Sequence, residues 1–581
     1  MPTTNDLRNL ATSERTVPPR GASISVKRPV WRPAGALWLA LAGCGPTGTT
    51  DVEEPCDAPG TYLYERDRTC YCTAAGTKAC AGPFEGEGDD GSVSDPIPYG
   101  SGTFVRAVFV VDSSPGMATI QREMARGAGA LVEALAAERI VLAATVVSAD
   151  GGTVGDACPA PERPPGIPIV ESCRARLDAF AAGPDAPQDP ASACTDVCDL
   201  DTLPEAIDPI EGMPFPGVVA HPDDAPDQAA ALRCAIPLGN TGCPFSQPIA
   251  ALDAFLDDAP DLFARYEAFN LAILVGDGDE CTTRDPSIYD PNGPKTFFDD
   301  PNATSATEAV CWNAGVACEG DPAGYDACAP VDLDASGDPA DADAAVLASV
   351  LDPDASVWSN PAGFPDLGEK LFVSIGGYDP GDPEGPLALS KGADPAFSSQ
   401  HGIDPGCSAE GIAATPPVRM DHFLRTRLED RGTDVMRVSA CADGYEAAMQ
   451  AVADRVATRR ESCGSGCLYD VDPDAPGVQF VCHFSTAALD GPGSVTLPLC
   501  EDAPGADGIP EGAFACVRVL GGEAAARTCG EELPDGVAFR MELSDEALRR
   551  APGWSFTANC IQGKLEDDGT CRADQIDPMY P

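Results

Sequence analysis

The sequence of 581 residues predicts an α/β fold: a doubly wound, mostly parallel sheet, followed by a small disulfide-rich β domain. Apolar runs suited to buried strands alternate with segments whose apolar residues recur at helical spacing, a pattern typical of a parallel sheet covered on both faces. From Cys463 onward, short runs alternate apolar and polar residues between Gly/Pro turns, which indicates antiparallel strands. Long acidic insertions into the sheet domain are expected at 150–240 and 281–368.

Five apolar runs are predicted to be the strands of the sheet. Each is rich in Val, Ile, Leu, Phe or Ala and is followed by a polar or glycine-containing break. The first of them breaks into Asp-Ser-Ser-Pro-Gly, and the third into Gly-Asp-Gly-Asp-Glu. The five predicted strands are Val105–Val111, Ile140–Ser148, Phe269–Val275, Leu371–Gly376 and Asp434–Ser439.

Helices are predicted between these strands, because their apolar residues repeat every three or four positions. The final helix has the clearest start, since Asp443 can cap it and Glu446 stands three residues later, as in a capping box. The predicted helical segments are Met117–Leu135, short stretches around Cys173–Ala182 and Asp227–Ala235, then Ser246–Leu256, Asp421–Leu428 and a closing helix that reaches Val456.

The charge of the chain excludes some partners. There are 92 acidic and 37 basic residues, so the formal net charge is −55. Such a field repels nucleic acid and anionic lipid headgroups, and it attracts divalent cations. We therefore expect no nucleic-acid partner, although the acidic surface alone also suits a soluble protein that faces a salty exterior.

The first 44 residues are predicted to be a targeting segment. Basic residues between Arg20 and Arg32 precede the short apolar stretch 35–43, which ends at Cys44. This stretch is too short to span a membrane, and Leu-Ala-Gly-Cys44 resembles the bacterial lipobox, in which the Cys is acylated. The resemblance implies a lipid-anchored protein of the cell envelope, on the outer membrane or cell surface, with the lipid as its only membrane contact. Ordinary secretion is the alternative.

The number of cysteines also indicates that the protein is exported from the cytoplasm. Of 25 cysteines, 24 remain when Cys44 is set aside, and an even number in a secreted chain indicates disulfides. Only four His are present, so a zinc site at the cysteines is disfavoured. We expect a small Cys-rich module at 45–80, an acidic Gly/Pro linker at 81–102 and a disulfide-rich β domain at 463–581.

The break after the first strand carries the candidate site. It resembles the first metal-binding loop of the von Willebrand factor type A (vWA) family, Asp-x-Ser-x-Ser, with Asp112 and Ser114 in place and Gly116 where the last hydroxyl is expected. The resemblance covers about 103–462 and implies a vWA/Rossmann-like fold. It implies a second loop at Thr241 and a third at Asp277, with Asp279 and Glu280 as additional acidic groups.

A site of this kind would hold Mg²⁺, Mn²⁺ or Ca²⁺ through oxygen ligands, with one position open to a carboxylate of a partner. The missing hydroxyl at Gly116 lowers the expected affinity and selectivity. The alternative is that Asp112 and Ser114 cap the helix that follows and that no metal binds.

A second candidate cation site lies in the later insertion. Its oxygen-bearing residues stand at positions 1, 3, 5, 7 and 12 with a glycine at position 6, which resembles an EF-hand or dockerin calcium loop. Pro339 departs from that pattern, and a chain rich in Asp produces such matches by chance. The residues are Asp332, Asp334, Ser336, Asp338 and Asp343.

No motif of a known catalytic class is present, so we expect a protein that is not an enzyme. The whole chain resembles cysteine-rich vWA lipoproteins of the myxobacterial type, which implies adhesion to a protein or glycan, with a divalent cation as cofactor. A metal-free structural envelope protein is the first alternative. A hydrolase with its site in 463–581 is disfavoured, because that region holds one His, His483.

Overall fold

The computed structural model describes most of the α/β domain between residues 103 and 458, together with short segments within 55–81 and 461–576. In the α/β domain the described ranges are 103–150, Cys158, 166–181, 189–209, 212–258, 268–351, 370–409, 411–431 and 433–458. The predicted signal region with Cys44 and the linker 82–102 lie outside the described residues.

A six-stranded sheet with the order β15-β12-β9-β4-β5-β8 forms the centre of the α/β domain. All neighbouring strands are parallel except β8, which pairs antiparallel with β5 at the edge. The five predicted strands are confirmed, each within one residue of its predicted bounds. The strands are β4 (Phe104–Val111), β5 (Val141–Ser148), β8 (Val218–Ala220), β9 (Phe269–Val275), β12 (Lys370–Gly376) and β15 (Asp434–Ser439).

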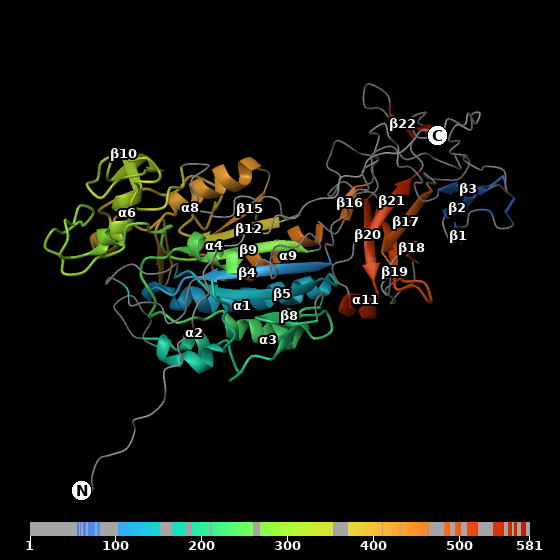
Figure 1. The fold of residues 1–581 in the computed structure, drawn as a ribbon, viewed down its shortest axis with the longest axis horizontal. Coiled ribbons are helices and arrows are strands. Elements are labelled where there is room, and N and C mark those ends of the chain that lie inside the picture. Colours follow the sequence, from blue (N-terminus) through green and yellow to red (C-terminus); the bar gives the residue numbers. More distant parts are fainter. Residues whose placement is uncertain are drawn as a thin grey trace, which may run out of the picture. The chain divides into compact units, whose positions relative to one another are not determined.

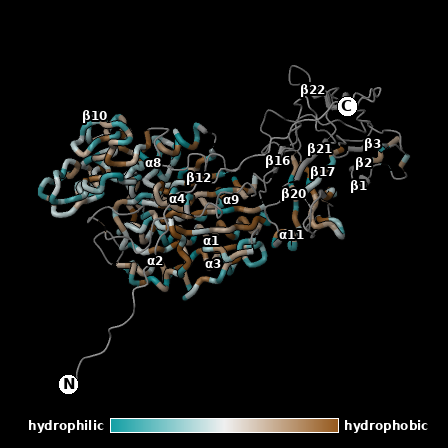
Figure 2. Tube along the Cα trace, viewed as in Figure 1, coloured by the Kyte–Doolittle hydropathy of each residue, from teal (hydrophilic) through white to brown (hydrophobic). Residues whose placement is uncertain are grey.

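Helices cover both faces of this sheet (Figure 1), because successive strand residues point to opposite sides. Phe109 and Val111 pack with α1 (Ala118–Ala137), α3 (Ala225–Ala235) and α9 (Glu446–Thr458). Val108 and Val110 pack on the other face with α4 (Pro248–Asp258), α8 (Val418–Phe423) and the π-helical turn Leu424–Leu428. The apolar colours of Figure 2 accordingly concentrate in the sheet and in α1.

Two details differ from the sequence predictions. Strand β8 and helix α3 lie within 150–240, which was assigned to an insertion, yet β8 completes the sheet and α3 packs beside α1. A strand of three residues at a sheet edge leaves no apolar run long enough to be recognised. Helix α9 begins at Glu446, so the exposed Asp443 stands outside the N-cap position assigned to it.

The remaining described elements of the α/β domain form its insertions. The segment after β9 contains a 3₁₀ turn (Pro286–Tyr289), α6 (Ala309–Gly315) and the hairpin of β10 (Val316–Asp321) and β11 (Gly324–Pro330). The segment after β12 contributes α7 (Pro395–His401), β13 (Cys407–Ala409) and β14 (Ile412–Ala414). Between β5 and α4 lie a 3₁₀ segment (Cys173–Ala179), α2 (Ser192–Thr195), β6 (Ala206–Ile207) and β7 (Pro214–Phe215), and Pro115–Met117 forms a 3₁₀ turn before α1.

The segments outside the α/β domain are antiparallel β structure, as predicted for the C-terminal region. In that region the described strands are β16 (Glu461–Cys463), β17 (Cys482–Ala487), β18 (Ser494–Leu497), β19 (Ala515–Leu520), β20 (Ala538–Leu543), β21 (Phe556–Cys560), β22 (Gly563–Leu565) and β23 (Cys571–Ile576), with helix α11 (Asp545–Arg550). The N-terminal module contains β1 (Tyr62–Glu65), β2 (Arg68–Cys72) and β3 (Lys78–Ala81).

Disulfides link many of the loops, which confirms the prediction from the cysteine count. Such cross-links indicate a protein that folds in an oxidising compartment. Within the described residues, no helix combines the length and the apolar character needed to cross a bilayer. The described pairs are Cys56–Cys72, Cys158–Cys243, Cys173–Cys194, Cys198–Cys234, Cys281–Cys311, Cys318–Cys328, Cys407–Cys441 and Cys500–Cys516.

Close packing of α1 against α9 predicts the effect of one substitution. A Cβ atom on Gly127 would lie 2.8 Å from Tyr445 Cβ and 3.1 Å from the Tyr445 backbone, so Gly127→Ala forces the two helices apart. We expect a loss of about 1–3 kcal/mol from overpacking, which lowers the melting temperature measured by circular dichroism.

Gly129→Ala in the same helix is the matched control. Its Cβ would meet Arg233 Nη1 at 2.6 Å, but this flexible side chain can move away. The control keeps or raises the melting temperature because alanine favours the helix by about 1 kcal/mol. Equal melting temperatures for the two variants would show that α1 and α9 do not pack as described.

Candidate cation site

The candidate site lies at the carboxyl ends of β4 and β9, the two central strands of the sheet. These strands are direct neighbours, and the backbone N–H of Asp112 donates to the carbonyl of Val275 at 2.9 Å. The chain leaves β4 toward β5 on one side, whereas β9 continues toward β12 on the other. In open α/β sheets, ligands bind where the direction of winding changes in this way.

Asp112 is a buried carboxylate in which only one of the two oxygens accepts a hydrogen bond from a described residue. The residue is 1% exposed, and its Oδ1 accepts a hydrogen bond from the Ser114 N–H at 2.8 Å. Its Oδ2 is buried and has no hydrogen-bond partner in the described part of the chain. Burial, followed by repulsion from Asp277, raises the pKa of Asp112 well above its ordinary value. Such a group needs a compensating proton or cation.

Ser114 joins the two strand ends. Its hydroxyl donates to Asp277 Oδ1 at 3.0 Å, so the structure brings together three of the predicted ligands, Asp112, Ser114 and Asp277. Asp277 is itself buried, and its backbone carbonyl accepts the N–H of Thr415 at 2.8 Å. Burial, then repulsion from Glu308, raises the pKa of Asp277 to about 6.

The position of Asp277 explains why residue 116 is a glycine. A Cβ atom on Gly116 would lie 2.1 Å from Asp277 Oδ2, closer than nonbonded atoms approach. A serine at this position therefore cannot be accommodated unless Asp277 moves. The departure from the Asp-x-Ser-x-Ser pattern leaves room for the second carboxylate.

The turn predicted to supply Thr241 lies beside the first loop, but Thr241 itself is exposed to solvent. Its neighbour Gly242 donates its N–H to the carbonyl of Ser113 at 2.9 Å. The buried hydroxyl in this segment belongs to Ser246: a Cβ atom on Gly276 would lie 3.5 Å from Asp112 Oδ2 and 3.9 Å from Ser246 Oγ. Ser246 is the first residue of the predicted helix Ser246–Leu256, and this position at a helix start was the available sequence signal for it.

Asp279 and Glu280, predicted as additional ligands, instead receive hydrogen bonds from backbone groups. Asp279 accepts the N–H groups of Arg419 and Met420 at the start of α8, and that of Glu280 at 2.8 Å. Glu280 accepts the N–H of Ile249 at the start of α4 at 3.1 Å. Carboxylates at helix N-termini are stabilising, so these two residues fix the helices on one face of the sheet.

Two residues of the insertions reach the site without having been predicted. Glu308 precedes α6, and its Oε2 lies 2.8 Å from Nδ1 of His401 at the end of α7. A Cβ atom on Gly278, the residue after Asp277, would lie 3.7 Å from Glu308 Oε2. Both residues line a small pocket together with Ser246, Gly278, Trp312 and Thr415.

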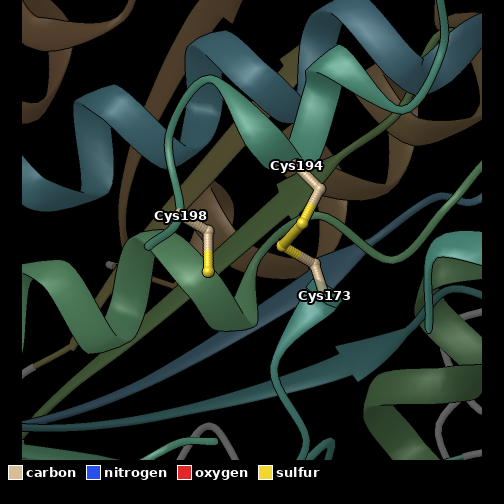
Figure 3. Close-up of side chains that lie close together, drawn as sticks. All are labelled: Cys173, Cys194 and Cys198. Carbon is tan, nitrogen blue, oxygen red and sulfur yellow. A yellow bond between two sulfur atoms is a disulfide. The ribbon is translucent and has the colours of Figure 1, made fainter. Parts of the chain in front are cut away.

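A second cluster of metal-binding residue types consists of Cys173, Cys194 and Cys198 (Figure 3). Among the described residues, they are the one set of three His, Cys, Asp or Glu whose ligand atoms all lie within 4.8 Å of one another. Cys173 is bonded to Cys194, and Cys198 is bonded to Cys234. Because these sulfurs are used in disulfides, they do not provide the thiolates that a metal requires.

The predicted calcium loop forms a turn, but its acidic groups do not converge. Asp334 Oδ1 accepts the N–H groups of Ser336 and Asp338 at 2.8 and 3.1 Å. Asp332 accepts the hydroxyl of Ser349, and the exposed Asp343 lies 3.8 Å from the guanidinium of Arg284. All of the loop's acidic residues are described, and no three of them bring carboxylate oxygens within 4.8 Å of one another.

The residues at the ends of β4 and β9 fit a hard divalent cation. Their donors are carboxylate and hydroxyl oxygens, which suit Mg²⁺, Mn²⁺ and Ca²⁺. The unpartnered Oδ2 of Asp112 is the atom that such an ion would satisfy. Asp112, Ser114 and Asp277 would hold the ion, and the ion would supply positive charge between two carboxylates that repel each other.

The comparisons with known proteins do not assign a family. No family model matches the chain, and no curated protein matches its sequence. Among solved structures, the open conformation of the pilus adhesin SpaC from Lactobacillus rhamnosus GG matches with a TM-score of 0.28 and 12% identity. The match covers 81% of this chain but 40% of that chain, and a TM-score this low supports no conclusion about fold or function.

The raised pKa values predict how the ion-free protein responds to pH. The folded state holds protons on Asp112 and Asp277 more tightly than the unfolded state, so these groups favour folding at low pH. The contribution of Asp277 is lost as the pH rises through about 6, its pKa in the folded state. In EDTA the melting temperature of the wild type should therefore fall between pH 5 and pH 7.5.

Asp112→Asn keeps the oxygen that accepts the Ser114 N–H and removes the charge of Oδ2. We expect it to raise the ion-free melting temperature at pH 7.5, by about 2–4 °C for each kcal/mol gained. Glu319→Gln, at an exposed position of β10, is the control and should leave it unchanged. A lower melting temperature of Asp112→Asn at pH 7.5 in EDTA would contradict the view that an uncompensated charge at Oδ2 opposes folding.

Proposed function

We propose that residues 103–462 form a vWA-like domain of a lipid-anchored cell-surface protein, which binds a protein or glycan partner through a divalent cation. The strand order and the antiparallel edge strand β8 support the vWA-like architecture. So does the Asp-x-Ser sequence at the end of β4, with Asp277 at the end of the neighbouring strand. Attachment through Cys44 rests on the lipobox resemblance, and the disulfides fit the same compartment.

The observation that carries the proposal is the unpartnered Oδ2 of Asp112. A metal-free structural role uses only Oδ1 of Asp112, through its hydrogen bond from the Ser114 N–H, and leaves the buried Oδ2 without a partner among the described residues. A bound cation would pair with Oδ2 and offset the repulsion between Asp112 and Asp277. A binding role is proposed because the site offers carboxylate and hydroxyl oxygens, the donors that a hard divalent cation prefers, beside a small pocket.

Titration of the purified chain with Mn²⁺, Mg²⁺ and Ca²⁺ by calorimetry tests this function. We expect one bound ion per chain, and a loss of affinity of at least about tenfold in Asp112→Asn and Asp277→Asn, since even the outer groups of metal sites typically contribute about tenfold or more. Affinity should also fall below about pH 6, because protons then compete for Asp277.

Glu319→Gln is again the control of equal charge and should bind the ion like the wild type. Partner binding is tested on glycan arrays and immobilised surface proteins, where signals should disappear both in EDTA and in Asp112→Asn. A wild-type chain that binds none of the three ions would contradict the proposed function.

A further inference from the structure

The insertion after β9 is covalently tied to the candidate cation site. Cys281, four residues after Asp277, is bonded to Cys311, three residues after Glu308. The N–H of Cys281 also donates to the carbonyl of Ser246 at 2.9 Å, so the disulfide is anchored beside the pocket. These connections hold Glu308 next to the loop that carries Asp277, although the two residues are far apart in the sequence.

Glu308 is a positioned side chain rather than a freely solvated one. Its carboxylate is hydrogen-bonded to His401, and both side chains are 15% exposed. The imidazole of His401 stacks on the ring of Phe397, with 3.9 Å between the ring centres. The carboxylate of Glu308 therefore has a defined direction.

The segment that contains helix α7 and His401 is held in place by the buried carboxylate of Asp404. Asp404 accepts the N–H groups of Gly392, Ala393 and Asp394 and the hydroxyl of Ser398. Burial alone would raise the pKa of Asp404, but these hydrogen bonds lower it to about 2, so it stays ionised at physiological pH. Helix α7 and its terminal His401 are thus fixed by interactions that do not involve the cation site.

Three carboxylates therefore surround one region at the edge of the sheet. Asp112 and Asp277 come from the strand ends, and Glu308 comes from the insertion. Glu308 lies close to this region, because a Cβ atom on Gly278, the residue after Asp277, would lie 3.7 Å from Glu308 Oε2, and its repulsion is among the causes that raise the pKa of both aspartates. The three do not bring oxygens within 4.8 Å of one another, so they cannot all bind one ion directly in this arrangement.

We propose that Glu308 is an internal ligand of the cation, bound to its outward side through a water molecule, in the position that a carboxylate of a partner would otherwise take. This inference rests on the proposed function of Asp112, Ser114 and Asp277. It means that the domain holds its ion firmly without a partner, and that an acidic partner must displace Glu308 in order to bind.

Calorimetric titration with Mn²⁺ tests the role of Glu308. Glu308→Gln keeps an oxygen that can face His401 and removes the charge, so its Kd for Mn²⁺ should rise about tenfold, as is typical for outer groups of metal sites. Glu319→Gln should bind Mn²⁺ like the wild type. Equal affinity in Glu308→Gln and the wild type would overturn the proposal.

Chemical rescue separates a ligand from a residue that only supports the fold. In Glu308→Ala, acetate should restore part of the Mn²⁺ affinity, because a free carboxylate can enter the vacated position. Acetate should have no effect on the wild type. Weakened Mn²⁺ binding in Glu308→Ala without rescue by acetate would assign Glu308 a positioning role and overturn the proposal.

Different results would refute the cation site and the role of Glu308. A wild type that binds no Mn²⁺ would refute the proposed function and with it the role of Glu308. If Mn²⁺ binds to the wild type, is lost in Asp112→Asn and is unchanged in Glu308→Gln, the cation site stands and the role of Glu308 alone is wrong.

Discussion

The structure around the candidate site depends on a carboxylate that the fold buries without satisfying it. Asp112 follows a fully buried strand, so it leaves water as soon as the sheet forms. The Ser114 N–H compensates one of its oxygens, and the other faces a region shared with Asp277. Two like charges in such a place oppose folding at neutral pH unless a proton or a cation joins them. Because the sheet places the ends of β4 and β9 side by side, the fold itself creates a buried region in which a positive charge is stabilising.

Helix caps and disulfides make the surroundings of the candidate site rigid. Asp279 and Glu280 cap the helices α8 and α4. In the acidic run after β9, these two residues therefore stabilise the fold, whereas Asp277 belongs to the candidate site. Disulfides reinforce the same edge: Cys158–Cys243 holds the turn that contains Thr241, and Cys281–Cys311 holds the start of α6. A site preorganised in this way loses little conformational entropy when it binds a ligand. The insertions thus form part of the edge of the sheet that carries the candidate site.

The sequence was informative where a pattern is local and failed where the contact is distant. Buried parallel strands are continuous apolar runs, so all five that were predicted are found, whereas the three-residue β8 carries no such signal. The resemblance to the vWA loops pointed to Asp112, Ser114 and Asp277, and they lie together because parallel strands bring their carboxyl ends to one edge. Glu308 and His401 lie 93 positions apart, in the insertions after β9 and after β12. Asp279 accepts the N–H groups of Arg419 and Met420, which are also distant in the sequence. Loop closure over such lengths is set by tertiary packing and disulfides.

A crystal of the full chain soaked with Mn²⁺ tests the central claim most directly, because the anomalous signal of the metal locates it without assumptions about its ligands. We predict a single strong peak within coordination distance, about 2.0–2.6 Å, of Asp112 Oδ2 or of a water bound to it, beside Ser114 and Asp277. A map with no peak there, while Asp112 Oδ2 stays buried and unpaired, would contradict the account.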